Sequence, residues 1–100
     1  MVKRQIIWTT KANIERKEIL EFWIVKNKSK DFSLKLNKLI TEAIDKISTN
    51  PWICRKTDFE NIRVKIVKNY LIFYEFNDFE IKILSIWDGR REEVNLLQAK

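Results

Sequence analysis

The chain is short and basic, and it lacks several residues on which enzyme sites depend. Its 100 residues hold 20 Lys and Arg against 14 Asp and Glu, a net charge of +6, with no histidine, one glycine, one proline and one cysteine. This length predicts one domain, residues 1–100, with a modest core. Because Cys54 stands alone, neither an internal disulfide nor a cysteine-based zinc site can form. One glycine excludes glycine-rich nucleotide loops, so we expect no metal and no cofactor.

The apolar residues are too dispersed for a membrane segment. No run approaches the roughly 20 apolar residues that span a bilayer, and the N-terminus turns polar again after Trp8, too early for a signal peptide. We therefore expect a cytoplasmic protein without a membrane partner. The basic charge suits a polyanion or an acidic protein partner, but lysines on solvated helix faces explain most of the same excess.

A short strand followed by a helix is predicted at the N-terminus. Residues 6–8, Ile-Ile-Trp, form a β-rich run. Thr9 or Thr10 then offers a hydroxyl that can cap a helix. Apolar and charged residues alternate in a mixed helical pattern over residues 11–26, so we expect the first helix there.

The clearest helix of the chain comes next. Ser29 or Asp31 can cap it, and Pro51 stops it because proline cannot continue the hydrogen-bond ladder. A connection this short between two helices predicts an antiparallel hairpin. Spacings of three and four residues place one apolar stripe on this helix: Phe32, Leu36, Leu39, Ile40, Ala43, Ile44 and Ile47.

The residues after Pro51 predict an antiparallel meander of three strands. After a polar, irregular connector at 52–60, residues 62–67 alternate as a half-exposed strand should. Residues 70–76 are apolar or aromatic on both faces, which predicts a central strand, and 81–87 supply the last one. Short polar turns join them, the first with Asn69 as the residue that tolerates left-handed angles. We expect an α+β fold in which the helical hairpin packs on one face of a twisted antiparallel sheet.

This order of elements, at this length, resembles the RelE/ParE superfamily of bacterial toxins from type II toxin–antitoxin pairs. The resemblance covers residues 6–91, and its most specific parts are the strand at 70–74 and the Ile-Trp-Asp-Gly-Arg-Arg ending at 86–91. It implies a growth-inhibiting toxin that a small cognate antitoxin neutralises. A basic toxin suits an acidic, partly disordered antitoxin. The alternative of another class is a non-toxic RNA-binding or adaptor domain.

The resemblance leaves the target open, and with it the question of whether the chain is an enzyme. ParE-like members poison DNA gyrase, whereas RelE-like members are ribosome-dependent mRNA endonucleases that use basic residues on the scissile phosphate and a proton-transferring side chain. Where those nucleases carry an arginine and a late tyrosine, this chain has Leu71 and Asn95. The incomplete set favours the ParE-like branch.

The residues that match the superfamily sites are cations on the first strand of the meander and after its last strand. Target binding is predicted for Arg63, Lys65, Arg90 and Arg91, and in the nuclease alternative the catalytic candidates are these four with Tyr70 and Tyr74. We expect Arg63 and Lys65 to share the exposed face of the sheet. An ordinary charged edge strand explains the first pair equally well, and core packing explains the tyrosines.

Overall fold

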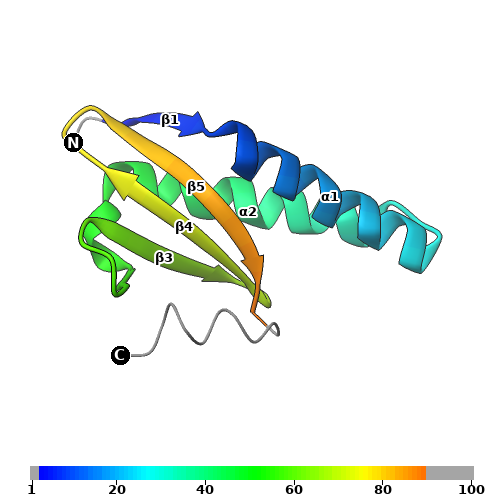
Figure 1. Ribbon diagram of the computed structural model, residues 1–100. Coiled ribbons are helices and arrows are strands. Elements are labelled where there is room, and N and C mark those ends of the chain that lie inside the picture. Colours follow the sequence, from blue (N-terminus) through cyan, green and yellow to red (C-terminus); the bar gives the residue numbers. More distant parts are fainter. Residues whose placement is uncertain (1–2, 90–100) are drawn as a thin grey trace.

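A helical hairpin covers one face of a five-stranded sheet (Figure 1), and the computed structural model describes this arrangement for residues 3–89. The predicted α+β fold class, with one strand, two helices and a three-strand meander, is confirmed. The elements in chain order are β1 (Gln5–Trp8), α1 (Thr10–Asn27), α2 (Asp31–Thr49), the short 3-10 helix η1 (Pro51–Ile53), β2 (Arg55–Lys56), β3 (Ile62–Val67), β4 (Tyr70–Phe76) and β5 (Glu80–Asp88).

The sheet is mixed, whereas the sequence predicted an antiparallel one. Its strand order is β1-β5-β4-β3-β2, and β1 runs parallel to β5, with Ile6 opposite Ile81 and Trp8 opposite Ile83. The other neighbouring strands are antiparallel. No tight turn fixes the direction of β1, because two helices separate it from the meander and provide the long connection that parallel strands need.

The predicted place of β4 inside the sheet is confirmed. β4 lies between β5 and β3, and its residues from Tyr70 to Tyr74 are buried. The connector at 52–60 is more regular than expected, since it contains η1 and the two-residue strand β2, which pairs with β3. This short strand forms one edge of the described sheet.

Capping fixes both ends of α1. The Thr9 hydroxyl accepts a hydrogen bond from the Ala12 N–H at 3.1 Å, so one of the two predicted caps is confirmed. At the other end, Lys28 adopts left-handed angles and its N–H bonds the carbonyl of Ile24. This left-handed residue lets the chain reverse into α2 without a glycine.

The apolar stripe of α2 forms the centre of the core. Leu36, Ile40, Ile44 and Ile47 are at most 2% exposed and pack against the sheet. Each such side chain stabilises the fold by about 1.5–3 kcal/mol through burial. α1 is less one-sided, because Ile14, Phe22 and Val25 remain exposed on it.

The two-residue turn between β3 and β4 is present, but Lys68 rather than Asn69 takes the left-handed angle, with φ of 56°. Asn69 instead directs its carbonyl to the Gly89 N–H, at 2.6 Å. The turn therefore also holds the end of β5. A side chain at position 89 would meet this carbonyl at 2.6 Å, so glycine is required there.

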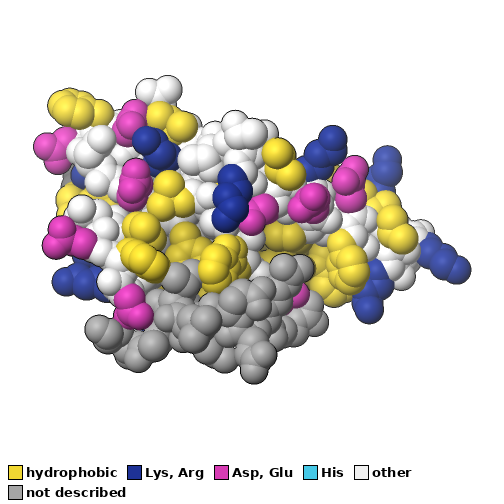
Figure 2. All heavy atoms as spheres, in the orientation of Figure 1, with side chains coloured by type: hydrophobic (Ala, Val, Ile, Leu, Met, Phe, Trp, Pro, Cys, Tyr) yellow, Lys and Arg dark blue, Asp and Glu magenta, His cyan; other side chains and the backbone are white. Residues whose placement is uncertain are grey.

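Apolar residues cover both faces of the sheet. The helix side is the larger cluster and includes Tyr70, Ile72, Tyr74, Ile81, Ile83 and Ile86. On the outer face Val64, Leu71 and Phe73 form a second cluster with Ile62 and Trp87. Figure 2 views the molecule from this outer side and shows hydrophobic side chains gathered along its middle.

Candidate functional site

Arg63 and Lys65 lie on the helix side of the sheet, so the prediction that they share its exposed face is wrong. In β3 they stand opposite Tyr74 and Ile72, which belong to the core beneath the helices. Cross-strand partners share a face. The predicted alternation of apolar and charged residues along β3 is correct. However, Val64 and Ile62 pack in the outer cluster, so the two cations between them in the alternation face α2 and η1.

Arg63 is a structural residue in this position. Its Nη1 donates hydrogen bonds to the carbonyls of Trp52 at 2.9 Å and Cys54 at 2.8 Å. These bonds satisfy the backbone where the chain leaves η1 and enters β2. The guanidinium therefore fastens this connector to β3, and reversal of its charge would weaken the fold.

Lys65 borders a groove between α2 and β3, which we call the α2–β3 groove. Its volume is about 370 Å³. Lys46 and Lys68 stand beside Lys65 on its wall, with Glu42 as the acidic residue among them. The residues that line it are Leu39, Glu42, Ala43, Lys46, Ile47, Ile53, Cys54, Lys65, Ile66, Val67 and Lys68.

The two candidate tyrosines are core residues whose hydroxyls have partners. Tyr70 is 4% exposed and accepts a hydrogen bond from the indole N–H of Trp23 at 2.7 Å. Tyr74 is fully buried and donates to the carbonyl of Pro51 at 2.8 Å. Burial, together with the Cys54 thiol beside it, raises the pKa of Tyr74 well above its ordinary value of 10.0. The Tyr74 hydroxyl is therefore enclosed in the core, away from any external substrate.

The outer face of the meander is apolar where a nuclease relative would carry an arginine. Leu71 is 5% exposed and packs with Val64 and Phe73. Phe73 in turn meets Trp87 edge to face, with ring centroids 5.3 Å apart. The buried members of this cluster offer no group that could bind a phosphate.

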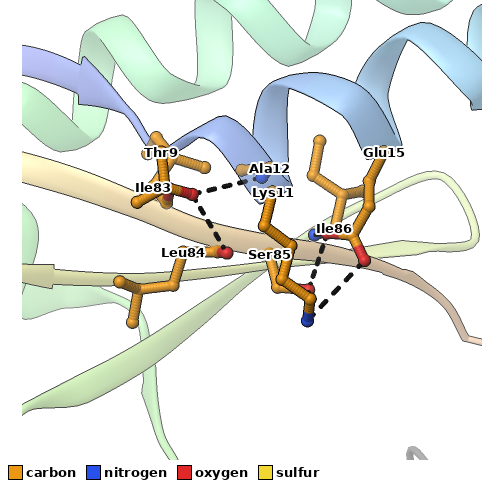
Figure 3. Close-up of polar contacts among 8 residues, drawn as sticks. All are labelled: Thr9, Lys11, Ala12, Glu15, Ile83, Leu84, Ser85 and Ile86. Carbon is orange, nitrogen blue, oxygen red and sulfur yellow. Dashed lines mark hydrogen bonds and ion pairs between the residues drawn. The ribbon is translucent and has the colours of Figure 1, made fainter.

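Sequence patterns did not reveal the polar anchor that joins α1 to β5 (Figure 3). The Oε1 atom of Glu15 accepts hydrogen bonds from the Ser85 hydroxyl at 2.8 Å and from the Ile86 N–H at 3.0 Å. Lys11 reaches the same Ser85 hydroxyl at 3.4 Å. The pairing of β4 with β5 shifts register close by, between Phe73 and Tyr74. Glu15 thus supplies an acceptor where the ladder is irregular.

Arg4 is a second residue that the sequence left unnoticed. It is 8% exposed, and its Nε donates to the carbonyl of Asn77 at 2.6 Å. Its guanidinium carbon lies 4.7 Å from the centroid of the Trp52 ring and 5.7 Å from that of Phe76. The contact of this cation with two aromatic rings ties the residue just before β1 to η1 and β4.

Arg90 and Arg91 lie outside residues 3–89, so their role in target binding stays a prediction. Among the described residues, no group of three His, Cys, Asp or Glu side chains could hold a metal ion. Neither of the two long helices in this part of the chain is both long and apolar enough to cross a membrane.

Comparison with known proteins assigns the family. The model of the ParE toxin of the type II toxin–antitoxin system parDE matches residues 6–93. No curated protein sequence gives a significant match. A solved structure of the chromosomal ParDE TA system from P. aeruginosa is similar in fold, with a TM-score of 0.71 and 20% identity, and the match covers 84% of this chain and 94% of that one. The chain belongs to the ParE toxin family of type II toxin–antitoxin systems.

Proposed function

We propose that this toxin stops growth by poisoning DNA gyrase in the cytoplasm and that a cognate antitoxin neutralises it. Membership of the ParE family supports the choice of gyrase, since gyrase is the target that the resemblance implies for the ParE-like branch. A net charge of +6 favours encounter with an enzyme that is bound to DNA.

One observation favours gyrase over ribosome-bound message as the target. The side chains at the positions that match the nuclease site are buried or bonded to the backbone. Leu71 is buried in the outer apolar cluster, and the Tyr74 hydroxyl is buried against a carbonyl. Arg63 is bound to two backbone carbonyls. RNA cleavage needs a phosphate-binding cation and a proton-transferring group in reach of the substrate, and these side chains serve the fold instead.

We assign target contact to Lys65, Arg90 and Arg91. Of these three, Lys65 lies within residues 3–89. Lys65 is half-buried and lines the α2–β3 groove, and Lys46 and Lys68 line the same groove. Three lysines in one place give a positive field that can steer an acidic surface. Arg63 is withdrawn from this set because its guanidinium is committed to the connector.

The experiment is induction of the chain alone in bacterial cells, with growth, the DNA-break response and message integrity followed together. We expect growth arrest with a DNA-break response while messages stay intact. Lys65→Glu should weaken the arrest, and Lys17→Glu on exposed α1 serves as the matched control that should not. Cleavage of translated messages without a DNA-break response would contradict the proposal.

A further inference from the structure

The outer face of the sheet is apolar, although neither long helix covers it. Its centre is the outer apolar cluster of Val64, Leu71 and Phe73, with Ile62 and Trp87 at the margin. Both long helices pack on the opposite face, and no other helix or strand of residues 3–89 lies over this one (Figure 1). A sheet face that stays in water normally carries polar side chains. This face therefore has the composition of one that is covered.

The three central side chains are shielded more than their neighbours in the sheet explain. Val64 is 2% exposed, and Leu71 and Phe73 are 5% exposed. Ile62 and Trp87 contact this cluster from the sides and are only half-buried themselves. Side chains stand roughly perpendicular to a sheet, so a layer above it is needed to shield their tips. The occupant of this face therefore has to come from outside residues 3–89.

The chain leaves β5 at the edge of the outer apolar cluster. The Gly89 N–H donates to the carbonyl of Asn69 at 2.6 Å, which fixes the end of the strand. A Cβ atom at position 89 would lie 2.7 Å from the Cδ1 atom of Leu71, so the backbone of Gly89 lies against the cluster. The residues that follow Gly89 therefore start beside Leu71.

The segment that follows, residues 90–100, has the length and composition to fill this face. It holds Val94, Leu96 and Leu97 within four positions. Its eleven residues would span about 16 Å even as a helix. β3 lies two strand spacings from β5, which is about 10 Å. The tether at Gly89 also gives the segment an effective concentration on the order of millimolar, an advantage over a free partner.

The charges on this face favour such a segment over a nucleic acid. Glu75 stands opposite Ile62 on one side and Lys82 on the other, which places both charged groups beside the cluster. Their Oε2 and Nζ atoms lie 3.9 Å apart, so this lysine already has a carboxylate beside it. Nucleic acids are bound by cations that neutralise phosphates. Residues 90–100 instead combine three basic and two acidic side chains with their apolar ones.

We propose that residues 90–100 fold back over the outer face of the sheet and cover the outer apolar cluster with their aliphatic side chains. The chain itself then occupies the face on which a nuclease relative would carry its arginine, and it closes this face to a message. The inference goes beyond the proposed function and does not depend on it, since the cover would form whether or not gyrase is the target.

Nuclear magnetic resonance of the full chain tests the contact directly. We expect nuclear Overhauser effects, which arise between protons in close contact, from the Leu96 or Leu97 methyl groups to the rings of Phe73 or Trp87. Contacts of these methyl groups with Phe22 on α1 instead, or with neither outer ring, would overturn the inference. In a mixture of labelled and unlabelled chains, contacts found only between chains would identify a second copy as the occupant and overturn it as well.

Matched variants of the full chain test whether the aliphatic side chains hold the segment in place. Leu96→Asp with Leu97→Asp puts two carboxylates among the apolar contacts, and Asn95→Asp with Gln98→Asp adds the same charge at polar positions. Trypsin cleaves after arginine, and a docked segment slows cleavage at 90 and 91 because it has to undock first.

We expect the leucine pair to be cleaved at these arginines about tenfold faster or more than the control pair. Equal rates for the two pairs, with unchanged cleavage within residues 3–89, would contradict the proposed cover. The resonance measurement uses the parent chain, so it decides the question even if the leucine pair does not fold.

Discussion

Glu15 and Ile86, 71 residues apart in the chain, are joined by a hydrogen bond of 3.0 Å from the backbone N–H of β5 to the carboxylate on α1. The same Oε1 atom accepts from the Ser85 hydroxyl at 2.8 Å. The side chain of Glu15 is 24% exposed. This carboxylate locks the first helix to the strand at the point where the register of the meander shifts.

Removal of this carboxylate should weaken the fold. Glu15→Ala leaves a buried N–H without its acceptor, and a hydrogen bond to a charged group contributes about 1.5–3 kcal/mol. We expect a loss of that order in the free energy of unfolding, measured by denaturant titration. Glu15→Gln keeps an oxygen acceptor and should lose less. Glu18 is exposed nearby on the same helix, so Glu18→Ala is the control. Equal denaturant midpoints for Glu15→Ala and Glu18→Ala would show that the Glu15 carboxylate does not stabilise the fold.

The stripe of α2 predicts a larger effect. Ile44 is 2% exposed in the core, so Ile44→Ala should lower the free energy of unfolding by about 2–5 kcal/mol through lost burial and the cavity left behind. Leu34→Ala on the same helix, where the side chain is 66% exposed, should change it little. Unfolding of both variants at the parent's denaturant midpoint would show that α2 does not pack as described.

Arg63 should behave as a structural residue. Arg63→Ala removes both bonds to the carbonyls of Trp52 and Cys54, and we expect a loss of about 1.5–3 kcal/mol in the free energy of unfolding. Lys65→Ala, two residues along the same strand, makes no bond of this kind among the described contacts and should cost less. An Arg63→Ala variant that is as stable as the parent but no longer toxic would restore Arg63 to the target-binding set.

Tyr74 predicts a stability change at high pH. Its pKa in the folded protein is raised above the ordinary value of 10.0, chiefly by burial. The folded state therefore keeps a proton that the unfolded chain releases, so this contribution is complete below pH 10 and declines as the pH rises above it. Tyr74→Phe should be less stable at neutral pH, because the Pro51 carbonyl loses its donor, and the two stabilities should converge above pH 10. Parallel thermal or denaturant curves across this range would contradict the assignment.

The sequence correctly predicted the features that depend on the residues within a single helix or strand. The stripe of α2 from Leu36 to Ile47, the interior place of β4 and the cap at Thr9 all follow from spacing and residue type within one element. The direction of β1 could not be predicted in this way, because its partner β5 is more than 70 residues away and no turn connects them.

The candidate site was harder to predict because it depends on which face of β3 meets the helices. Alternation showed that Arg63 and Lys65 share a face, but it does not say which face is covered. The sequence also gives no sign that the Arg63 guanidinium would meet the carbonyls of the connector, or that Glu15 would meet the backbone of β5. Contacts of a side chain with a distant backbone leave no periodic pattern.

The most direct test of the central claim is a supercoiling and DNA-cleavage assay with purified gyrase, the purified toxin and plasmid DNA, beside a ribosome-bound message under the same conditions. We expect the toxin to inhibit supercoiling and to cause gyrase-dependent plasmid breaks while the message stays intact. Addition of the antitoxin should abolish the effect. Unchanged gyrase activity together with cleavage of the ribosome-bound message would contradict the account and identify the chain as a ribonuclease.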